Sequence, residues 1–424
     1  CIIFGIMDRL IFVLVYFYLG GSMKKHKHFI YIILVLLFSL LLLDNVNVEK
    51  LYNLKDGFYT NYSEVENVSK EGKFGRFVSL SLKDDELQTG CNNDGEGSVI
   101  FKLFGFIPIK KVDVKLLPED EVFVGGVPIG LSVETDGAVV VSDVIVDTQH
   151  NQVIKNKVIK SGDIIKKIND VEIESIDDIT TALNTNHDAL ANIEVIRDNK
   201  RKNLEVELLK DKDNHYKLGV WVKNDVSGIG TLTFVRKTDS SFGALGHPVT
   251  NAGSDTVVPI VEGDVYDCNI IGVNKGQRNQ PGELRGVFLQ KDSKGKISKN
   301  TPYGIFGKLN DYEGLVDTNV SLKIGGRLSV KPGKAKIISS VSGIREEYDI
   351  EIIKANFQSK SSDKSIVFRV TDKRLLDITG GIVQGMSGSP IVQDDKLVGA
   401  VTHVFLSDST KGYGVYSDWM LEQL

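Results

Sequence analysis

Hydrophobic and polar positions divide the chain into segments of different character. The first is an unbroken apolar run at residues 29–43, directly after the basic segment 23–28. Because such a run has no polar face to present to water, it is typical of a membrane helix rather than of a buried core helix. We expect residues 1–43 to form a single anchor that is retained, since no small-residue cleavage site follows, with translation starting at Met23. The lysine-rich end is then cytoplasmic, and the remainder of the chain lies across the membrane.

The middle of the chain alternates between short apolar runs and polar turns. Residues 44–111 carry weak strand signals and are expected to form a stalk and β-rich linker. Residues 112–210 contain short β-rich runs around one helical segment, whose start is marked by Ser175 and Asp178 as a capping box. This pattern predicts a small α+β domain.

Residues 211–424 are rich in glycine and in short strand-like runs, which include HYKLGVWV, GIGTLTFV, KSIVFRV and KLVGAVTHVF. No long helices alternate with these runs, so an antiparallel barrel or a pair of barrels is favoured over a parallel sheet. The chain as a whole is therefore predicted to be mainly β.

Composition narrows the range of functions. Apolar residues make up 42% of the 424 positions, enough for real hydrophobic cores, and the net charge is only −5. No long basic run exists outside the N-terminus, so nucleic acid is not an expected partner. The three cysteines, Cys1, Cys91 and Cys268, are far apart and form neither a disulfide framework nor a zinc site. We expect no metal and no organic cofactor.

The hexapeptide GMSGSP at residues 385–390 carries the most distinctive chemistry of the chain. Ser387 lies between Gly385 and Gly388, whose backbone can bend sharply and approach a substrate closely. A serine hydroxyl becomes a good nucleophile only when a neighbouring base accepts its proton. The segment that follows, residues 391–404, is predicted to be a hairpin. A glycine turn with a surface serine is the alternative interpretation.

The base for Ser387 has to come from the seven histidines. Five of them lie in the N-terminal flank or in and just after the α+β domain: His26, His28, His150, His187 and His215. His247 lies in the glycine-bounded turn SFGALGHPVTNAG, an exposed position typical of a site residue. His403 lies on a strand after the serine and is expected to pack or to face the substrate. We therefore assign the base to His247.

The acid that orients this base is less constrained. In the order His–Asp–Ser it lies between the two assigned residues, and Asp372 stands at the end of a strand that enters the serine loop. Asp372 is therefore one candidate for the acid. Spacing does not decide between it and three rivals, which are Asp377, Asp255 and Asp264.

Part of the α+β segment resembles a PDZ domain of the bacterial protease type. The matching sequences are GDII, IND, the capped helix and IEVIRDNKRKNLEVEL. In such domains a loop of backbone N–H groups receives a peptide C-terminus, and the next strand pairs with the peptide. The resemblance places this peptide-binding loop in GGVPIGLSV, at Val127, Ile129, Gly130 and Leu131, although Pro128 removes one donor. A domain that only packs against its neighbour is the alternative.

The GMSGSP segment and its hairpin resemble the chymotrypsin-like serine proteases. The resemblance implies that Ser387 is the nucleophile, that the amides of Gly385 and Ser387 form the oxyanion hole, and that residues 402–404 lie beside the bound substrate. The short spacing from Asp372 to the serine departs from the usual pattern of that family.

A narrower resemblance combines the anchor, the PDZ-like segment, FGALGHPV, GGIVQGMSGSPIVQDDKLVGAVTHVF and GYGVYSDWM. Together they are similar to the stage IV sporulation protein B peptidases of spore-forming bacteria. The resemblance implies a serine endopeptidase with His247, Asp372 and Ser387 at its active site. It also implies export from the forespore into the space between the two spore membranes. There the family cleaves itself and a membrane-bound regulator of an intramembrane protease, which releases processing of pro-sigma-K.

Two other functions are weighed against this one. A peptide-binding adaptor with an inactive barrel would be expected to lack one of the catalytic residues, yet both the serine and the turn histidine are present. A general quality-control protease would carry its PDZ domain after the catalytic part, whereas here the PDZ-like segment comes first.

Overall fold

The computed structural model describes these parts of the chain: residues 47, 51, 54, 57–60, 62–83, 96–116, 121–147, 152–186, 188–211, 213–250, 257–277, 279–355 and 362–424. The predicted anchor at residues 1–43 and the rival Asp255 lie outside them. Within the described part, no helix has the length and apolar character that a membrane crossing requires. The fold is mainly β and includes a closed barrel, which fits a chymotrypsin-like protease.

The N-terminal part folds as a sheet with its own core. The sheet has the order β1-β4-β3-β2, and one helix packs on it. The bounds are β1 (Phe58–Thr60), α4 (Tyr62–Glu71), β2 (Val78–Lys83), β3 (Glu96–Leu103) and β4 (Ile107–Leu116). Phe74 and Phe101 are fully buried and meet edge to face, with ring centroids 5.0 Å apart. A packed sheet therefore stands where the sequence predicted a stalk and linker with weak strand signals.

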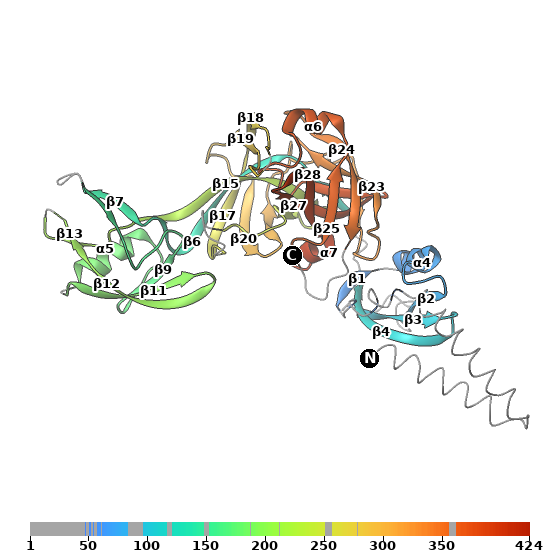
Figure 1. Ribbon diagram of the computed structural model, residues 1–424, viewed down its shortest axis with the longest axis horizontal. Helices are drawn as coiled ribbons and strands as arrows, with labels where there is room; N and C mark the ends of the chain where they lie inside the picture. Colours follow the sequence, from blue (N-terminus) through green and yellow to red (C-terminus); the bar gives the residue numbers. More distant parts are fainter. Residues whose placement is uncertain are drawn as a thin grey trace, which may run out of the picture.

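The predicted α+β segment contains a single helix that packs on antiparallel strands (Figure 1). The bounds are β7 (Val144–Asp147), β8 (Gln152–Lys155), β9 (Ile164–Ile168), β10 (Val171–Glu172), α5 (Ile176–Asn184), β11 (Leu190–Arg197), β12 (Lys200–Glu207), β13 (Leu209–Lys210) and β14 (Tyr216–Lys217). The predicted capping box is confirmed, because the Asp178 carboxylate accepts hydrogen bonds from the N–H and the hydroxyl of Ser175, at 2.7 and 2.9 Å. These bonds satisfy polar groups at the helix start, and so they fix where α5 begins.

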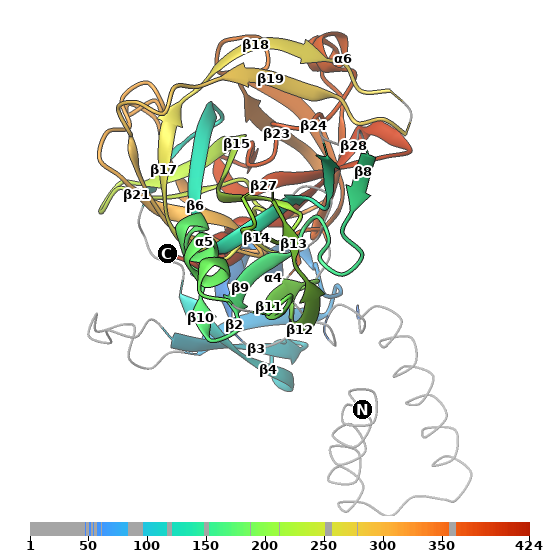
Figure 2. The ribbon, with the colours of Figure 1, turned by 90° about the vertical axis from the view of Figure 1, so that its left-hand side faces the viewer.

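Two long strands join the α5 region to the barrel, as Figures 1 and 2 show. They are β6 (Pro128–Ser142) and β15 (Trp221–Arg236), which pair antiparallel along most of their length. In β15 the first half alternates between exposed and half-buried residues, whereas Gly230 to Val235 are all buried. One strand thus borders the α5 helix at its start and forms part of the barrel core at its end.

The remaining elements complete the barrel and its loops. Their bounds are β5 (Glu121–Val124), β16 (Ser241–Ala244), β17 (Ile260–Asp267), β18 (Asn269–Asn274), β19 (Glu283–Val287), β20 (Gly295–Thr301), β21 (Gly304–Leu309), β22 (Ser321–Ile324), β23 (Gly333–Ser339), β24 (Glu346–Ala355), β25 (Ile366–Val370), α6 (Lys373–Thr379), β26 (Pro390–Gln393), β27 (Lys396–Phe405), β28 (Asp408–Tyr416) and α7 (Ser417–Leu421). Strands β26, β27 and β28 follow one another as antiparallel neighbours, so the hairpin predicted after the serine is confirmed.

Candidate active site

The nucleophile candidate Ser387 lies in a tight loop between α6 and β26. Gly385 and Gly388 have φ values of 95° and 97°, a region that side chains rarely adopt. A Cβ atom at position 388 would lie 2.1 Å from the carbonyl oxygen of Thr231. Both glycines are therefore required by the path of the loop, as the hexapeptide predicted.

Two N–H groups of this loop are unused. Most of the neighbouring N–H groups donate to backbone carbonyls: Gln384 to Gly282 at 2.8 Å, Met386 to Val383 at 3.2 Å, Gly388 to Val401 at 2.8 Å and Ser389 to Met386 at 2.9 Å. The N–H groups of Gly385 and Ser387 have no hydrogen-bond partner among the described residues. These are the two amides that were predicted to form an oxyanion hole. A pair of free N–H groups beside a serine hydroxyl is what stabilisation of a tetrahedral oxyanion requires.

The loop that carries His247 packs against the serine loop. A Cβ atom at Gly388 would lie 2.6 Å from the N atom of Leu245, and one at Gly246 would lie 3.0 Å from the side chain of Thr402. The Ser387 hydroxyl donates to the carbonyl oxygen of the same Thr402 at 2.9 Å. The fold therefore brings together the two segments that hold His247 and Ser387, which are far apart in sequence. No hydrogen bond between the two side chains is formed in the described structure.

The histidine ring is held in one tautomer by the backbone. Nδ1 of His247 lies 2.9 Å from the carbonyl oxygen of Pro248, which can only accept a hydrogen bond. Nδ1 must therefore carry the proton, and Nε2 is left with a free lone pair. Burial lowers the pKa of His247 below its ordinary value. The hydrogen bond with the Pro248 carbonyl and the charge of Asp363 act in the opposite direction, but burial is the larger effect. A neutral imidazole with a free Nε2 is the form that a general base needs.

A second histidine faces the first one. The rings of His247 and His403 have centroids 5.3 Å apart and an interplanar angle of 43°. Nδ1 of His403 lies 3.5 Å from a carboxylate oxygen of Asp363. Burial and the neighbouring His247 lower the pKa of His403 to about 4, against the opposing charge of Asp363. Asp363 is thus the carboxylate whose charge acts on both rings, and the sequence analysis did not single it out.

The structure places Asp372 in a different network. Its side chain caps α6 by accepting from the N–H of Arg374 at 2.9 Å, and it also pairs with the Arg374 guanidinium at 2.8 Å. Arg374 is the main cause that lowers the pKa of this carboxyl group. A further bond at 3.3 Å comes from the N–H of Asp349. None of these contacts involves His247, so the assignment of Asp372 as the acid stays a prediction.

The rival acids Asp264 and Asp377 also make their contacts away from the histidines. Asp264 accepts from the hydroxyl of Ser293 at 2.7 Å and pairs with Lys296 at 3.1 Å, on the exposed side of β17. Asp377 lies on α6, the helix that Asp372 caps. Neither contacts a histidine in the described structure.

The strand predicted to add a peptide has no free edge. Gly130 pairs with Ile229 of β15 on one side and with Tyr266 of β17 on the other, and Leu131 is likewise paired on both sides. A peptide can join a sheet only at an unpaired edge. The strand next to the predicted loop, residues 131–133, therefore cannot take up a peptide, and the peptide-binding roles of Val127, Ile129, Gly130 and Leu131 lose their basis. Ile129, Gly130 and Leu131 lie in strand β6 of the barrel sheet instead, and Val127 comes just before it.

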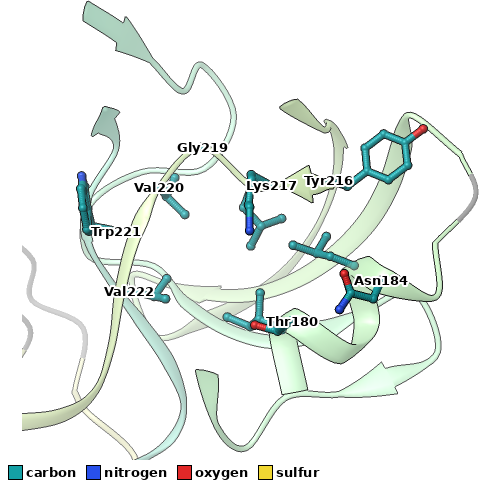
Figure 3. Close-up of a pocket in the computed structure, with 11 residues that line it drawn as sticks. Thr180, Asn184, Tyr216, Lys217, Gly219, Val220, Trp221 and Val222 are labelled. Carbon is teal, nitrogen blue, oxygen red and sulfur yellow. The ribbon is translucent and has the colours of Figure 1, made fainter. Parts of the chain in front are cut away.

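A cavity lies beside the helix of the α+β segment, between α5 and residues 216–222 (Figure 3). Its volume is about 290 Å³, and its lining is mostly apolar. Thr180 and Asn184 of the helix stand on one side, while Val220 and Val222 point toward it from the other. The N–H groups of Gly219 and Val220 make no hydrogen bond with any described residue. From sequence, this stretch, HYKLGVWV, was predicted to belong to the barrel.

One group of described side chains has the spacing of a metal site. Ligand atoms of Asp211, Asp213 and His215 lie within 4.8 Å of one another. They belong to the turn between β13 and β14, where Asp213 and His215 are exposed. Asp211 accepts hydrogen bonds from the N–H groups of the other two, so the turn itself accounts for the cluster.

A family model matches the C-terminal part of the chain. Residues 214–421 match the model of the SpoIVB peptidase S55 family. Among solved structures, the active form of the Rv3671c protease from M. tuberculosis matches with 13% sequence identity and a TM-score of 0.26, over 47% of this chain and 73% of that one. A likeness at that score carries no functional argument. No curated protein matches the chain significantly.

Proposed function

We propose that this chain, which belongs through residues 214–421 to the SpoIVB peptidase S55 family and is a serine peptidase, uses Ser387 as its nucleophile and His247 as its base. The observation that carries this proposal is the pair of unused N–H groups at Gly385 and Ser387, beside the hydroxyl of Ser387 itself. The neighbouring N–H groups of the loop, at Gln384, Met386, Gly388 and Ser389, are all bonded, so these two donors are the ones that the loop leaves for an oxyanion.

The reaction follows from these groups. Rotation of the Ser387 side chain moves its hydroxyl from the Thr402 carbonyl toward Nε2 of His247, which accepts the proton as Oγ attacks the peptide carbonyl carbon. The two free N–H groups bind the oxyanion that forms. The imidazolium then gives its proton to the leaving amine, which breaks the peptide bond and leaves an acyl-enzyme. Water, deprotonated by His247, hydrolyses the ester and regenerates the hydroxyl.

The Pro248 carbonyl does part of the work of a triad acid, because it fixes the tautomer of His247. The charge that stabilises the imidazolium comes, we infer, from Asp363, with His403 between the two. The family resemblance implies Asp372 as the acid. In this proposal Asp372 instead has a structural role: it caps α6, the helix that precedes the serine loop.

The α5 cavity is proposed as the peptide-binding groove of a PDZ-like domain. Two observations support it: an apolar cavity between a helix and a strand, and two unbonded N–H groups at Gly219 and Val220 at one end of that strand. Such N–H groups are suited to a peptide carboxylate, and the apolar lining to its last side chain. The groove would deliver a protein substrate, including a second copy of the chain.

The biological setting is carried by the family resemblance. We propose a membrane-anchored peptidase exported from the forespore, which cleaves itself and a membrane-bound regulator and so releases processing of pro-sigma-K. The apolar run at residues 29–43 supports the anchor. Its protein substrates and its location between the spore membranes are proposals of the same kind.

A serine-directed fluorophosphonate probe tests the assignment of the nucleophile, because it labels activated serines without a known cleavage sequence. Ser387→Ala is expected to abolish labelling and cleavage of the chain by itself while leaving the circular dichroism spectrum unchanged. Ser389→Ala is the matched control: this hydroxyl lies two residues away, is buried and has no hydrogen-bond partner among the described residues. Labelling that persists in Ser387→Ala, with contaminating protease excluded, would refute the assignment.

A further inference from the structure

Strand β15 holds the serine loop by two side chains. The hydroxyl of Thr231 donates to the carbonyl oxygen of Gly385 at 2.7 Å, and the hydroxyl of Thr233 donates to that of Gly388 at 2.8 Å. The N–H of Thr231 also donates to the carbonyl oxygen of Ser387 at 3.0 Å. Two residues of β15 therefore bind the carbonyl groups of three residues of the serine loop, one of which is Ser387.

Both threonines are deeply buried. Their exposed fractions are 2% and 1%, so neither hydroxyl has water as an alternative partner. Valine has the same shape and is the usual residue of a buried strand, which means that packing alone does not call for a hydroxyl. Burial of an unbonded hydroxyl is costly, and here each one is matched to a loop carbonyl.

The two threonine hydroxyls hold the carbonyl groups of Gly385 and Gly388, the two glycines of the serine loop. Gly385 and Gly388 have no side chains, and rotation about their backbone bonds would turn the adjoining peptide planes. The plane before Gly385 carries one of the two N–H groups that face the oxyanion, and a turn of the plane after Ser387 would shift the residue that carries the other. An oxyanion hole contributes to catalysis only when its donors are already in place before the reaction. The same strand reaches the histidine loop, because the carbonyl of Thr231 accepts from the N–H of Leu245 at 3.2 Å.

We propose that Thr231 and Thr233 are positioning residues that hold the oxyanion hole of this peptidase in its reactive geometry. The inference rests on the proposed roles of Gly385 and Ser387. Both threonines are too deeply buried to be offered to a substrate. Each acts through the carbonyl group that it binds, and Thr231 additionally ties the serine loop to the loop of His247.

The test compares Thr231→Val and Thr233→Val with the serine variants at the same positions. Valine keeps the shape and removes the hydroxyl, whereas serine keeps the hydroxyl. The readout is the rate of labelling by the fluorophosphonate probe, whose phosphonyl oxygen occupies the oxyanion hole. We expect each valine variant to label roughly tenfold to a hundredfold more slowly and each serine variant to recover most of the rate.

Thr135→Val is the matched control. Thr135 lies on β6, is fully buried, and its hydroxyl binds the carbonyl oxygens of Gly137 and Asn224 rather than the serine loop. Its loss is expected to lower stability without changing the labelling rate of the folded protein.

Three results would overturn the proposal: unchanged labelling in both valine variants, serine variants as slow as the valine ones, or an equal loss in Thr135→Val. If Ser387→Ala is inert while the valine variants label normally, the threonine proposal fails and the proposed function stands. If Ser387→Ala still labels, the proposed function itself fails.

Discussion

The two ends of β15 serve two sites of opposite character. At its start, Val222 borders an open apolar cavity beside α5, next to Val220 just before the strand, and Trp221 is 63% exposed. At its end, Thr231 and Thr233 are buried, and both hydroxyls donate to carbonyl groups of the serine loop. The first end leaves N–H groups and apolar surface for a ligand to fill. The second has used its own hydrogen-bonding groups to fix a neighbouring loop.

This difference corresponds to the two tasks of binding and reaction. A groove that accepts a peptide gains from accessible surface and tolerates small movements of its walls. A reactive loop gains from donors that are already in place, which requires a packed support. The comparison therefore predicts that stability and chemistry depend on the end of β15, while substrate choice depends on its start.

The largest expected effect is on stability. Val235→Ala, in the fully buried half, should lower the free energy of unfolding by about 2–3 kcal/mol, because it removes two methyl groups and leaves a cavity. Val222→Ala is the matched substitution in the half-buried part and should cost about 1 kcal/mol or less. Urea unfolding of both variants measures the difference. Equal losses would contradict the division of the strand into a rigid and an open half.

Local sequence signals predicted the local geometry that the structure shows. Ser387 and its glycines were identified from six residues, because the loop needs φ values that glycine supplies and a hydroxyl that those glycines leave accessible. The capping box at Ser175 and Asp178 is likewise a local signal, and the structure confirms it. The histidine in its glycine-bounded turn was identified by the same kind of reasoning.

Non-local pairing was not predictable in the same way. The segment 127–131 has the apolar pattern of a strand, but nothing in that pattern shows that β15 and β17 occupy both of its edges. Asp363 has no distinctive neighbours in sequence, and it reaches the histidines only because β27 and the chain before β25 come together. The cavity beside α5 was missed because HYKLGVWV has the same alternation as the barrel strands that follow it.

The next largest effect is expected from removing the charge of a candidate acid, Asp363 or Asp372. Asp363→Asn removes the charge that favours protonated His247, so labelling should slow several-fold at pH 8. The base works only when neutral, and burial holds its pKa below the ordinary value of about 6.5. The rate should therefore fall as pH drops through a midpoint below about 6.5, and Asp363→Asn should move that midpoint to lower pH. Labelling rates measured from pH 4.5 to 8.5 test this.

Asp372→Asn is the comparison for that experiment. Loss of the exposed Arg374 pair should reduce stability only slightly, because asparagine still caps α6, and the pH midpoint should stay unmoved. A labelling rate reduced by a thousandfold or more in folded Asp372→Asn, with Asp363→Asn near normal, would instead identify Asp372 as the acid.

The smallest effect is expected at the open end of β15. Thr180 stands at the cavity beside α5 and is exposed, so Thr180→Phe should fill the groove without disturbing the core. Thr181→Phe is the matched control, since the next residue along a helix points about 100° away. The substrate is the full chain with Ser387→Ala, present at low concentration, which an active variant cleaves in trans. Thr180→Phe should slow this cleavage a few-fold and leave fluorophosphonate labelling unchanged, because only delivery is impaired.

Fluorophosphonate labelling reports the chemistry at Ser387 without peptide delivery, so it separates the roles of the two ends of β15. If Thr180→Phe slows labelling as well, the start of β15 controls the chemistry at its end, and the two sites are coupled rather than separate. If Thr181→Phe slows trans cleavage equally, the effect comes from the helix surface and the cavity is not the groove. Only slower cleavage at unchanged labelling, confined to Thr180→Phe, agrees with a strand whose two ends have divided binding and reaction between them.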